Sequence, residues 1–238
     1  MSLSGVLRIL FLLIALTFTT VSPVLPARSP LADNIPRQLI DMGGGDNPCA
    51  LLVEKSKQKL YLYANQKNTY LLLETFQCST GENDGDKKRE GDRKTPEGVY
   101  FITRVIDGKK LPPKYGVRAF VLDYPNYVDR RVKKGGNGIW LHGTNKHVAP
   151  TDTNGCVVLR NKDILHLSRY IKPYGTPIII VEEVEYVHKD LLVQERREIR
   201  KFIFKWRTYW EGKELTRHMT CYSRRFRSKD MNRHSWKA

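Results

Sequence analysis

The sequence contains little cysteine and comparatively few acidic residues. Its 238 residues include 4 cysteines, which are scattered and form no CxxC pair, and this argues against a disulfide scaffold, a zinc knuckle and a redox-active pair. Asp and Glu number 25 against 41 Lys and Arg, so the net charge is +16. With 40% hydrophobic residues and 12 tyrosines, the chain is long and apolar enough for one folded domain and a smaller additional part.

The excess of positive charge is concentrated near the C-terminus. Residues 189–238 hold 15 Lys and Arg against 6 Asp and Glu. Such a surface suits an anionic partner, for example a cell-wall polymer, a membrane face or nucleic acid, but a solvated basic face explains it as well. Nucleic acid is the weakest of these partners because the basic segment carries no recognised nucleic-acid-binding motif, and we expect none to be bound.

Residues 1–27 have the features of a signal peptide or an N-terminal membrane anchor. Arg8 supplies a positive charge before an apolar run at residues 9–21, which is shorter than the about 20 residues of a membrane span. Cleavage after Ala27 is one alternative, but Leu25 is a poor match to the small residue expected there, so an uncleaved anchor is the other. No cysteine follows the run, which argues against a lipoprotein. We therefore expect an exported protein of the periplasm or cell envelope.

Residues 28–46 are rich in proline and glycine and are predicted to be a linker, whereas residues 47–184 carry the patterns of β-strands. Leucine and tyrosine alternate over residues 59–63, a period of two that is typical of a strand. The predicted elements are strands at 50–54, 59–63, 70–79, 119–123, 139–141 and 176–181, a turn and strand at 95–102, an exposed loop at 81–94, a basic loop at 108–114, and a short helix at 161–171. The first three strands suggest an antiparallel meander in a mainly β, sandwich-like fold.

Residues 185–238 change to a helical period. Apolar residues recur along one helix face up to Gly212, which predicts the end of that helix; they are Leu192, Ile199, Ile203, Trp206 and Trp210. A second, shorter amphipathic helix is predicted from Leu215 to Phe226. Two such helices cannot bury their aromatic faces alone, so they either pack on the sheet or belong to a second domain.

A cysteine and a histidine lie in one segment, residues 138–161. A cysteine attacks as a thiolate, and a nearby imidazole takes its proton, so Cys156 and His142 are a candidate nucleophile and base. The Gly143 carbonyl is a candidate partner for the second ring nitrogen of His142. Gly155 removes a side chain where a substrate carbonyl must approach, and the N–H groups of Gly155 and Cys156 are candidates for an oxyanion hole. The alternative is a buried inert thiol and a core histidine.

Two further combinations of residues have simpler explanations. His147 with His142 and Cys156 makes an incomplete metal site without a fourth ligand, and we expect neither a metal nor an organic cofactor. Cys49 and Cys78 both lie on predicted strands, so a disulfide in an oxidising compartment is conceivable.

Several short motifs occur in a fixed order along residues 49–183. They are Ser79-Thr80-Gly81, the turn Thr95-Pro96-Glu97-Gly98-Val99-Tyr100, His142-Gly143-Thr144, and Thr153-Asn154-Gly155-Cys156. This stretch resembles the L,D-transpeptidase (YkuD-type) catalytic domain. The resemblance implies a YkuD-like β-sandwich of mixed sheets, with a short helix after the catalytic cysteine.

The resemblance also implies acyl transfer on peptidoglycan stem peptides. Cys156 would attack the carbonyl before a terminal D-Ala and release that residue, with His142 as base and then acid. The acyl group would pass to an amine, including that of a wall-attached protein, or to water in an L,D-carboxypeptidase. A non-catalytic wall-binding module is the alternative from another class.

The residues around the cysteine depart from the commonest family pattern. Asn154 stands where the family often has histidine, and three apolar residues follow Cys156 before Arg160, which is the candidate for a substrate contact. The resemblance implies that Thr144, Thr153 and Asn154 contribute to substrate binding. The tail resembles the first helices of the NTF2-like domain found in a subgroup of the family, here incomplete.

Overall fold

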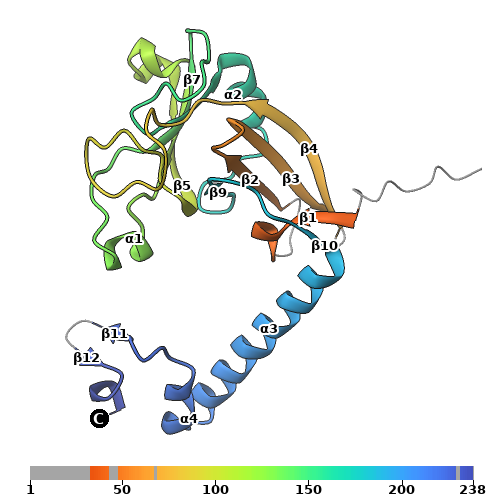
Figure 1. Ribbon diagram of the computed structural model, residues 1–238, viewed down its shortest axis with the longest axis vertical. Helices are drawn as coiled ribbons and strands as arrows, with labels where there is room; N and C mark the ends of the chain where they lie inside the picture. The colour runs from red at the N-terminus through yellow and green to blue at the C-terminus, as the bar shows by residue number, and fades with distance from the viewer. Residues whose placement is uncertain (1–32, 43–47, 67–68, 229–230, 238) are drawn as a thin grey trace, which may run out of the picture.

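The computed structural model describes residues 33–42, 48–66, 69–228 and 231–237 (Figure 1). The predicted export segment, residues 1–27, lies outside the described residues. In chain order the elements, with η for 3-10 helices, are β1 (Asn34–Pro36), η2 (Arg37–Leu39), β2 (Cys49–Glu54), β3 (Lys59–Gln66), β4 (Thr69–Gln77), β5 (Gly98–Asp107), η3 (Gly108–Lys110), η4 (Pro113–Tyr115), β6 (Arg118–Leu122), α1 (Tyr127–Arg131), β7 (Trp140–Thr144), β8 (Val157–Arg160), α2 (Asn161–Leu167), β9 (Pro177–Val181), β10 (Tyr186–His188), α3 (Lys189–Glu211), α4 (Leu215–Thr220), β11 (Arg227–Ser228), β12 (Met231–Asn232) and η5 (Ser235–Lys237).

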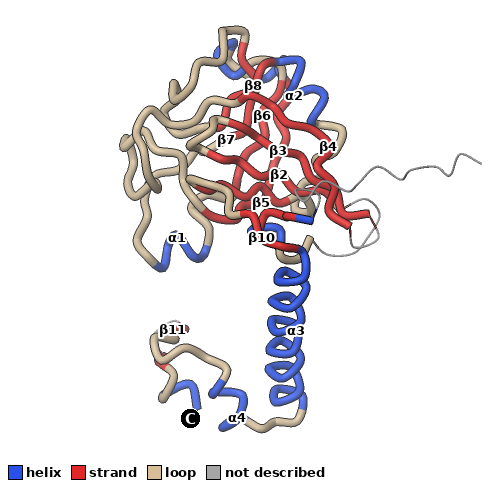
Figure 2. Tube along the Cα trace, turned by 45° about the vertical axis from the view of Figure 1, so that its right-hand side comes forward, coloured by secondary structure: helices blue, strands red, loops and turns tan. Residues whose placement is uncertain are grey.

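Eight strands form one curled sheet of mixed pairing (Figures 1 and 2). Their order is β4-β3-β2-β9-β5-β6-β7-β8, in which β2 with β9 and β7 with β8 run parallel and the other pairs antiparallel. The mixed sheets that we predicted are joined into one sheet, because β5 pairs with β9 on one side and with β6 on the other. The predicted mainly β class, with a short helix after the cysteine, is confirmed.

The alternation in β3 divides its side chains between two cores. Leu60 and Leu62 are fully buried in the main core, which also receives side chains from β5 to β8 and from α2. Tyr61 and Tyr63 point to the opposite face and pack in a second core. Burying one leucine stabilises the fold by about 1.5–3 kcal/mol, so the period of two determines which way this strand faces.

The second core is covered by segments that are distant in the sequence. β1 pairs antiparallel with β10, and Leu39, Val187 and Leu192 pack on the tyrosine face of β3. Residues 33–42, which we assigned to a linker, are therefore part of the folded domain. The difference arises because Leu39, only 1% exposed, finds an apolar surface that local composition does not reveal.

One strand, two helix ends and one cysteine pair also differ from the prediction. β8 follows the cysteine directly and was not predicted as a strand, because its apolar run is only three residues long. The predicted helix at 161–171 ends at Leu167, and α4 ends at Thr220 rather than at Phe226. Cys49 and Cys78 are free thiols, so the conceivable disulfide is not formed.

The charged loop at residues 81–94, predicted to be exposed, is partly buried. Lys87 is 3% exposed, and its ammonium contacts the Asp92 carboxylate at 2.6 Å. Asp92 also accepts hydrogen bonds from the backbone N–H groups of Lys88, Arg89 and Lys94. Burial by itself would raise the pKa of the Asp92 carboxyl, but these four donors together lower it well below its usual value.

We expect Asp92→Asn to reduce the free energy of unfolding by about 1–3 kcal/mol at pH 6, because it leaves backbone donors without an ionised acceptor. The pKa of Asp92 is lower in the folded than in the unfolded state, where it is about 3.9. Its contribution is therefore present above that pH and is lost as the pH falls below it. Urea unfolding of wild type and variant from pH 6 to pH 2.5 measures this.

The difference between wild type and Asp92→Asn should narrow steadily below about pH 4. Asp84→Asn is the matched control, because Asp84 is exposed in the same loop, and it should change stability little. A loss for Asp92→Asn that stayed constant with pH would contradict the role given to its charge.

The tail extends away from the sheet on α3 and then folds back on itself (Figures 1 and 2). His218 is 1% exposed and packs against the rings of Trp206, Trp210 and Tyr222. The indole N–H of Trp206 donates to the Tyr222 hydroxyl at 3.0 Å. Much of the predicted apolar face of α3 remains exposed. The first half of α3 contacts the sheet domain, where Leu192 is buried in the second core and Arg196 donates to the Tyr70 hydroxyl of β4.

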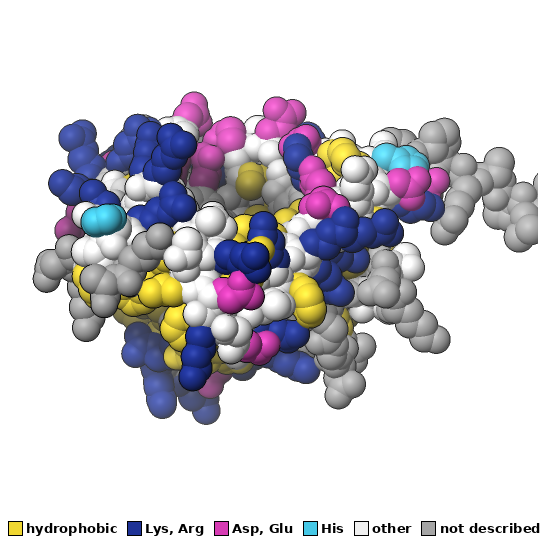
Figure 3. Space-filling view, turned by 90° about the horizontal axis from the view of Figure 1, so that it is seen from below, with side chains coloured by type: hydrophobic (Ala, Val, Ile, Leu, Met, Phe, Trp, Pro, Cys, Tyr) yellow, Lys and Arg dark blue, Asp and Glu magenta, His cyan; other side chains and the backbone are white. Residues whose placement is uncertain are grey.

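Seen from the tail side, the molecule carries more Lys and Arg than Asp and Glu side chains on its surface (Figure 3). Arg131 of α1 donates to the backbone carbonyls of Arg225 and Arg227, which connects the tail to the sheet domain. Among the described helices, none has both the length and the apolar character needed to cross a membrane.

Candidate active site

His142 and Cys156 line the same pocket, which has a volume of about 310 Å³. His142 lies in the middle of β7, and its partner across the parallel pairing with β8 is Val158. Cys156 stands two residues before Val158, so the register of β7 and β8 brings the imidazole and the thiol to one place.

The orientation of the His142 ring is determined by a backbone contact. Its Nδ1 lies 2.7 Å from the Gly143 carbonyl oxygen, as expected from the sequence. Because a carbonyl oxygen only accepts, Nδ1 carries the proton and Nε2 is left as a basic nitrogen. Burial lowers the pKa of His142 below its usual value; the Gly143 carbonyl opposes this and the charge of Lys114 adds to it.

Cys156 is half-buried and its sulfur contacts two backbone groups. The thiol donates to the Gly138 carbonyl oxygen at 3.6 Å, and the backbone N–H of Trp140 donates to the sulfur. Burial raises the pKa of the Cys156 thiol, while the Trp140 N–H and the charges of Lys114 and Lys87 partly oppose it. Both pKa shifts favour the uncharged forms of the thiol and the imidazole at neutral pH.

These directions predict a simple pH dependence for alkylation of Cys156 by iodoacetamide. The rate should be low at pH 7 and rise about tenfold per pH unit to above pH 9, because only the thiolate reacts and its pKa lies above the usual value of about 8.5. Intact mass measured over time follows the reaction. Cys156→Ser, which retains the other three cysteines, identifies the fraction that belongs to Cys156. A rate that stayed flat down to pH 5 would indicate a thiolate–imidazolium pair instead.

The turn before Cys156 is held by Thr153. Its Oγ1 accepts from the Gly155 N–H at 3.0 Å and donates to the Cys156 carbonyl at 2.8 Å. The Gly155 N–H is therefore already used, which corrects our expectation that it forms part of an oxyanion hole. The Cys156 N–H remains as the candidate from that pair.

Gly155 is required by the protein's own packing rather than by substrate approach alone. Its φ of +121° is unfavourable for residues with a side chain, and a Cβ there would lie 2.6 Å from the Lys94 carbonyl oxygen. The Thr95 hydroxyl donates to the Gly155 carbonyl at 3.0 Å and accepts from the Gly81 N–H at 2.8 Å. Three of the sequence motifs thus meet at the turn that presents the cysteine.

The other predicted site residues separate into two groups. Thr144, Thr153 and Asn154 line the pocket. Arg160 is not among the lining residues and instead contacts the Asp163 carboxylate at 2.6 Å, so the expected substrate contact is not supported by its position. The mismatch arises because Arg160 ends β8 and leads into α2, where a carboxylate three residues later faces it.

Sequence reasoning missed one wall of the pocket, formed by η4. Lys114 and Tyr115 line the pocket, and the Tyr115 ring lies 5.0 Å from the His142 ring and 4.8 Å from that of Trp140 between centroids. The Pro-Pro and Gly116 around this segment signal a turn, but no local pattern shows that the turn packs on β7.

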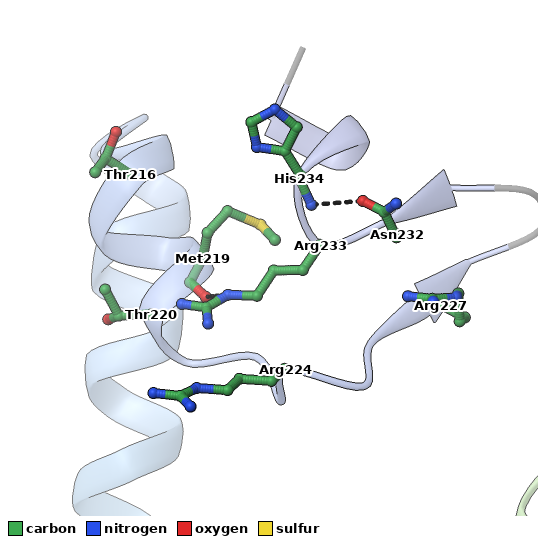
Figure 4. Close-up of a pocket in the computed structure, with 8 residues that line it drawn as sticks. All are labelled: Thr216, Met219, Thr220, Arg224, Arg227, Asn232, Arg233 and His234. Carbon is green, nitrogen blue, oxygen red and sulfur yellow. Dashed lines mark hydrogen bonds between the residues drawn. The ribbon is translucent and has the colours of Figure 1, made fainter.

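The structure offers no metal centre among the described residues, since no group of three potential ligands comes together there. A second pocket, of about 560 Å³, lies between α4 and the β11–β12 hairpin and is shown in Figure 4. Arginines and threonines line it, and it contains none of the predicted site residues. The candidate chemistry is therefore confined to the pocket of Cys156.

The fold and the pocket together define a domain that presents a thiol and an imidazole at the edge of a curled mixed sheet. Comparison with known proteins identifies the family to which such a domain belongs. Residues 49–180 match the family model for YkuD, the L,D-transpeptidase catalytic domain. The chain therefore belongs to the YkuD family of L,D-transpeptidase catalytic domains.

Two solved structures are similar over most of the chain. Bd1075 of Bdellovibrio bacteriovorus is 32% identical, with a TM-score of 0.74 over 86% of this chain and 74% of that one. The helical cell shape determining protein Pgp2 of Campylobacter jejuni is 26% identical, with a TM-score of 0.69 over 83% of this chain and 70% of that one. YafK of Escherichia coli (strain K12) is 26% identical over 139 residues, which are 57% of this chain and 53% of YafK, so the chain spans about half the length of that relative.

Proposed function

We propose that this protein is an exported cysteine L,D-transpeptidase that acts on peptidoglycan stem peptides. The observation that carries the proposal is the pocket shared by His142 and Cys156, in which the Gly143 carbonyl leaves Nε2 of the imidazole as a base. Membership of the L,D-transpeptidase family supports the substrate class.

In the proposed reaction the Cys156 thiol turns from the Gly138 carbonyl toward His142, which takes its proton as the sulfur attacks the substrate carbonyl. The C–N bond to the terminal D-Ala breaks, and His142 returns the proton to the departing amine. The acyl group then sits on sulfur as a thioester. An incoming amine gives up a proton to His142 and takes the acyl group, which restores the thiol.

The backbone around the thiol would stabilise the oxyanion of each tetrahedral intermediate. We assign this role to the Cys156 N–H, because the Gly155 N–H is engaged by Thr153. Asn154 and Thr144, which line the same pocket, would contact the peptide backbone. Metal and organic cofactors have no part in this scheme.

The acceptor distinguishes two versions of the proposal. An amine from a second stem, or from a wall-attached protein, gives a crosslink, whereas water gives an L,D-carboxypeptidase. Mass spectrometry of products from defined tetrapeptide muropeptides decides between them. Dimers that lack one D-Ala indicate transpeptidation, and tripeptides without dimers indicate hydrolysis. Absence of both products from folded protein would contradict the proposal and favour a non-catalytic wall-binding module.

We further propose that residues 1–27 direct export and that the tail is the beginning of an NTF2-like domain. The similarity to Bd1075 extends over 86% of this chain, more than the catalytic domain alone, which supports a shared tail. Limited proteolysis tests the arrangement, because cleavage between residues 184 and 193 that released a stable catalytic domain would identify the tail as a separate unit.

A further inference from the structure

The 3-10 helix η4 is held directly against the strand that carries His142. Gly116, which follows η4, has a φ of +66°, and a Cβ there would lie 2.5 Å from the backbone carbon of Gly143. The Val117 N–H donates to Asn161 Oδ1 at 3.1 Å, which connects the end of this turn to the start of α2. This close contact between two backbones fixes η4 as a wall of the catalytic pocket, although Lys114 itself is solvent-exposed there.

Lys114 stands on this wall and lines the pocket with His142 and Cys156. Its ammonium lies 4.9 Å from the centroid of the Tyr115 ring. Lys87 and Lys134, which are less exposed, each contact a carboxylate between 2.6 and 3.1 Å, whereas no carboxylate lies within ion-pair distance of Lys114 in the part of the chain that the structure describes. Lys114 therefore presents a positive charge to the pocket, and no carboxylate among the described residues forms an ion pair with it.

The charge of Lys114 reaches both reacting groups. Burial raises the pKa of the Cys156 thiol and lowers that of His142, and Lys114 lowers both. Lys146 also lines the pocket, and Asp152 is the single carboxylate among the described lining residues. The described lining thus carries two lysines against one carboxylate, and the charge of Lys114 acts on both the thiol and the imidazole, which suits an anionic group of the substrate.

We propose that Lys114 binds the terminal carboxylate of the donor peptide, on the residue that leaves. The inference rests on the proposed function. When Cys156 attacks the carbonyl before the last residue, the carboxylate lies one residue further on, roughly 3.5 Å along an extended chain. It therefore falls within the same pocket as the sulfur. Lys114 selects peptides that end one residue after the attacked carbonyl, and it discriminates against longer or amidated chains.

The first test compares two donors that differ only in that group, namely a stem tetrapeptide ending in D-Ala and the same peptide ending in D-alaninamide. Wild type should prefer the carboxylate by about 10- to 100-fold in kcat/KM, the range of a charge-assisted hydrogen bond. In Lys114→Gln the preference should fall to about threefold or less. Lys110→Gln, which removes an exposed lysine from the neighbouring η3, should keep the wild-type preference. The ratio isolates recognition, because any effect of the substitution on the thiol pKa acts equally on both peptides.

The second test needs no peptide turnover. Cys156 is alkylated with anionic iodoacetate and, separately, with neutral iodoacetamide. Because Lys114 attracts the anionic reagent, the rate with iodoacetate divided by the rate with iodoacetamide should fall by about threefold or more in Lys114→Gln, but not in Lys110→Gln. If Lys114→Gln keeps the wild-type ratio in both assays, the inference is wrong. If wild type turns over neither peptide while the alkylation ratio still changes in Lys114→Gln, the proposed function is wrong. The role of Lys114 in binding the donor carboxylate is then wrong as well, although its positive charge acts in the pocket.

Discussion

Cys156→Ala should abolish product formation from tetrapeptide muropeptides, with a loss of about 10⁴-fold or more, because no other group in the pocket can form the thioester. The substitution removes one sulfur from a half-buried position and should leave the fold intact. Product mass spectrometry on wild type and variant, with thermal unfolding on the same samples, measures both effects.

Cys221→Ala is the matched control for this prediction. Cys221 is also a half-buried free thiol, but it lies in the tail after α4 and outside the catalytic pocket. Activity should therefore stay near the wild-type level. If Cys156→Ala still turned over substrate after contaminating enzyme had been removed, the assignment of Cys156 as the nucleophile would be wrong.

Gly155→Ala should cost about 2–5 kcal/mol in the free energy of unfolding and at least 100-fold in activity. The added Cβ would stand 2.6 Å from the Lys94 carbonyl oxygen on a backbone with a φ of +121°, so strain and overlap add together. Relief requires the turn to move, and that turn carries Cys156. In a chain of this size the melting temperature should fall by roughly 5–15 °C.

Gly91→Ala separates the two contributions to that loss. Gly91 also has a positive φ, +72°, but a Cβ there would meet nothing within 4 Å. It should therefore show only the backbone strain, about 1–2 kcal/mol, with activity near wild type. If Gly91→Ala and Gly155→Ala destabilised the protein equally, overlap with Lys94 would not be the reason for glycine at position 155.

Much of the fold could be predicted because its signals are local. The alternation of residues 59–63 predicted both the strand and its two faces, since successive side chains of a strand point to opposite faces and here the leucines and the tyrosines enter different cores. The apolar period of α3 and the end at Gly212 were likewise predicted and are present. β8 was missed because three apolar residues carry too little periodicity to distinguish a strand from a loop.

The pairing of the segment before the sheet could not be predicted in this way. β1 joins β10, about 150 residues later in the chain, and the linker composition of residues 28–46 gave no indication of it. Pairing at that separation depends on how the rest of the sheet has curled, which no local window contains.

The sequence alone determined the identity and order of the candidate reacting groups, His142 with Gly143 and then Cys156, because these residues are close along the chain and their chemistry is a property of residue type. Only the tertiary structure decided what surrounds them. Thr153 uses the Gly155 N–H, Arg160 faces Asp163 instead of the pocket, and Lys114 enters the pocket from η4. These outcomes depend on hydrogen bonds and backbone contacts between strands and turns that are distant in the sequence, and such contacts exist only once the sheet has closed.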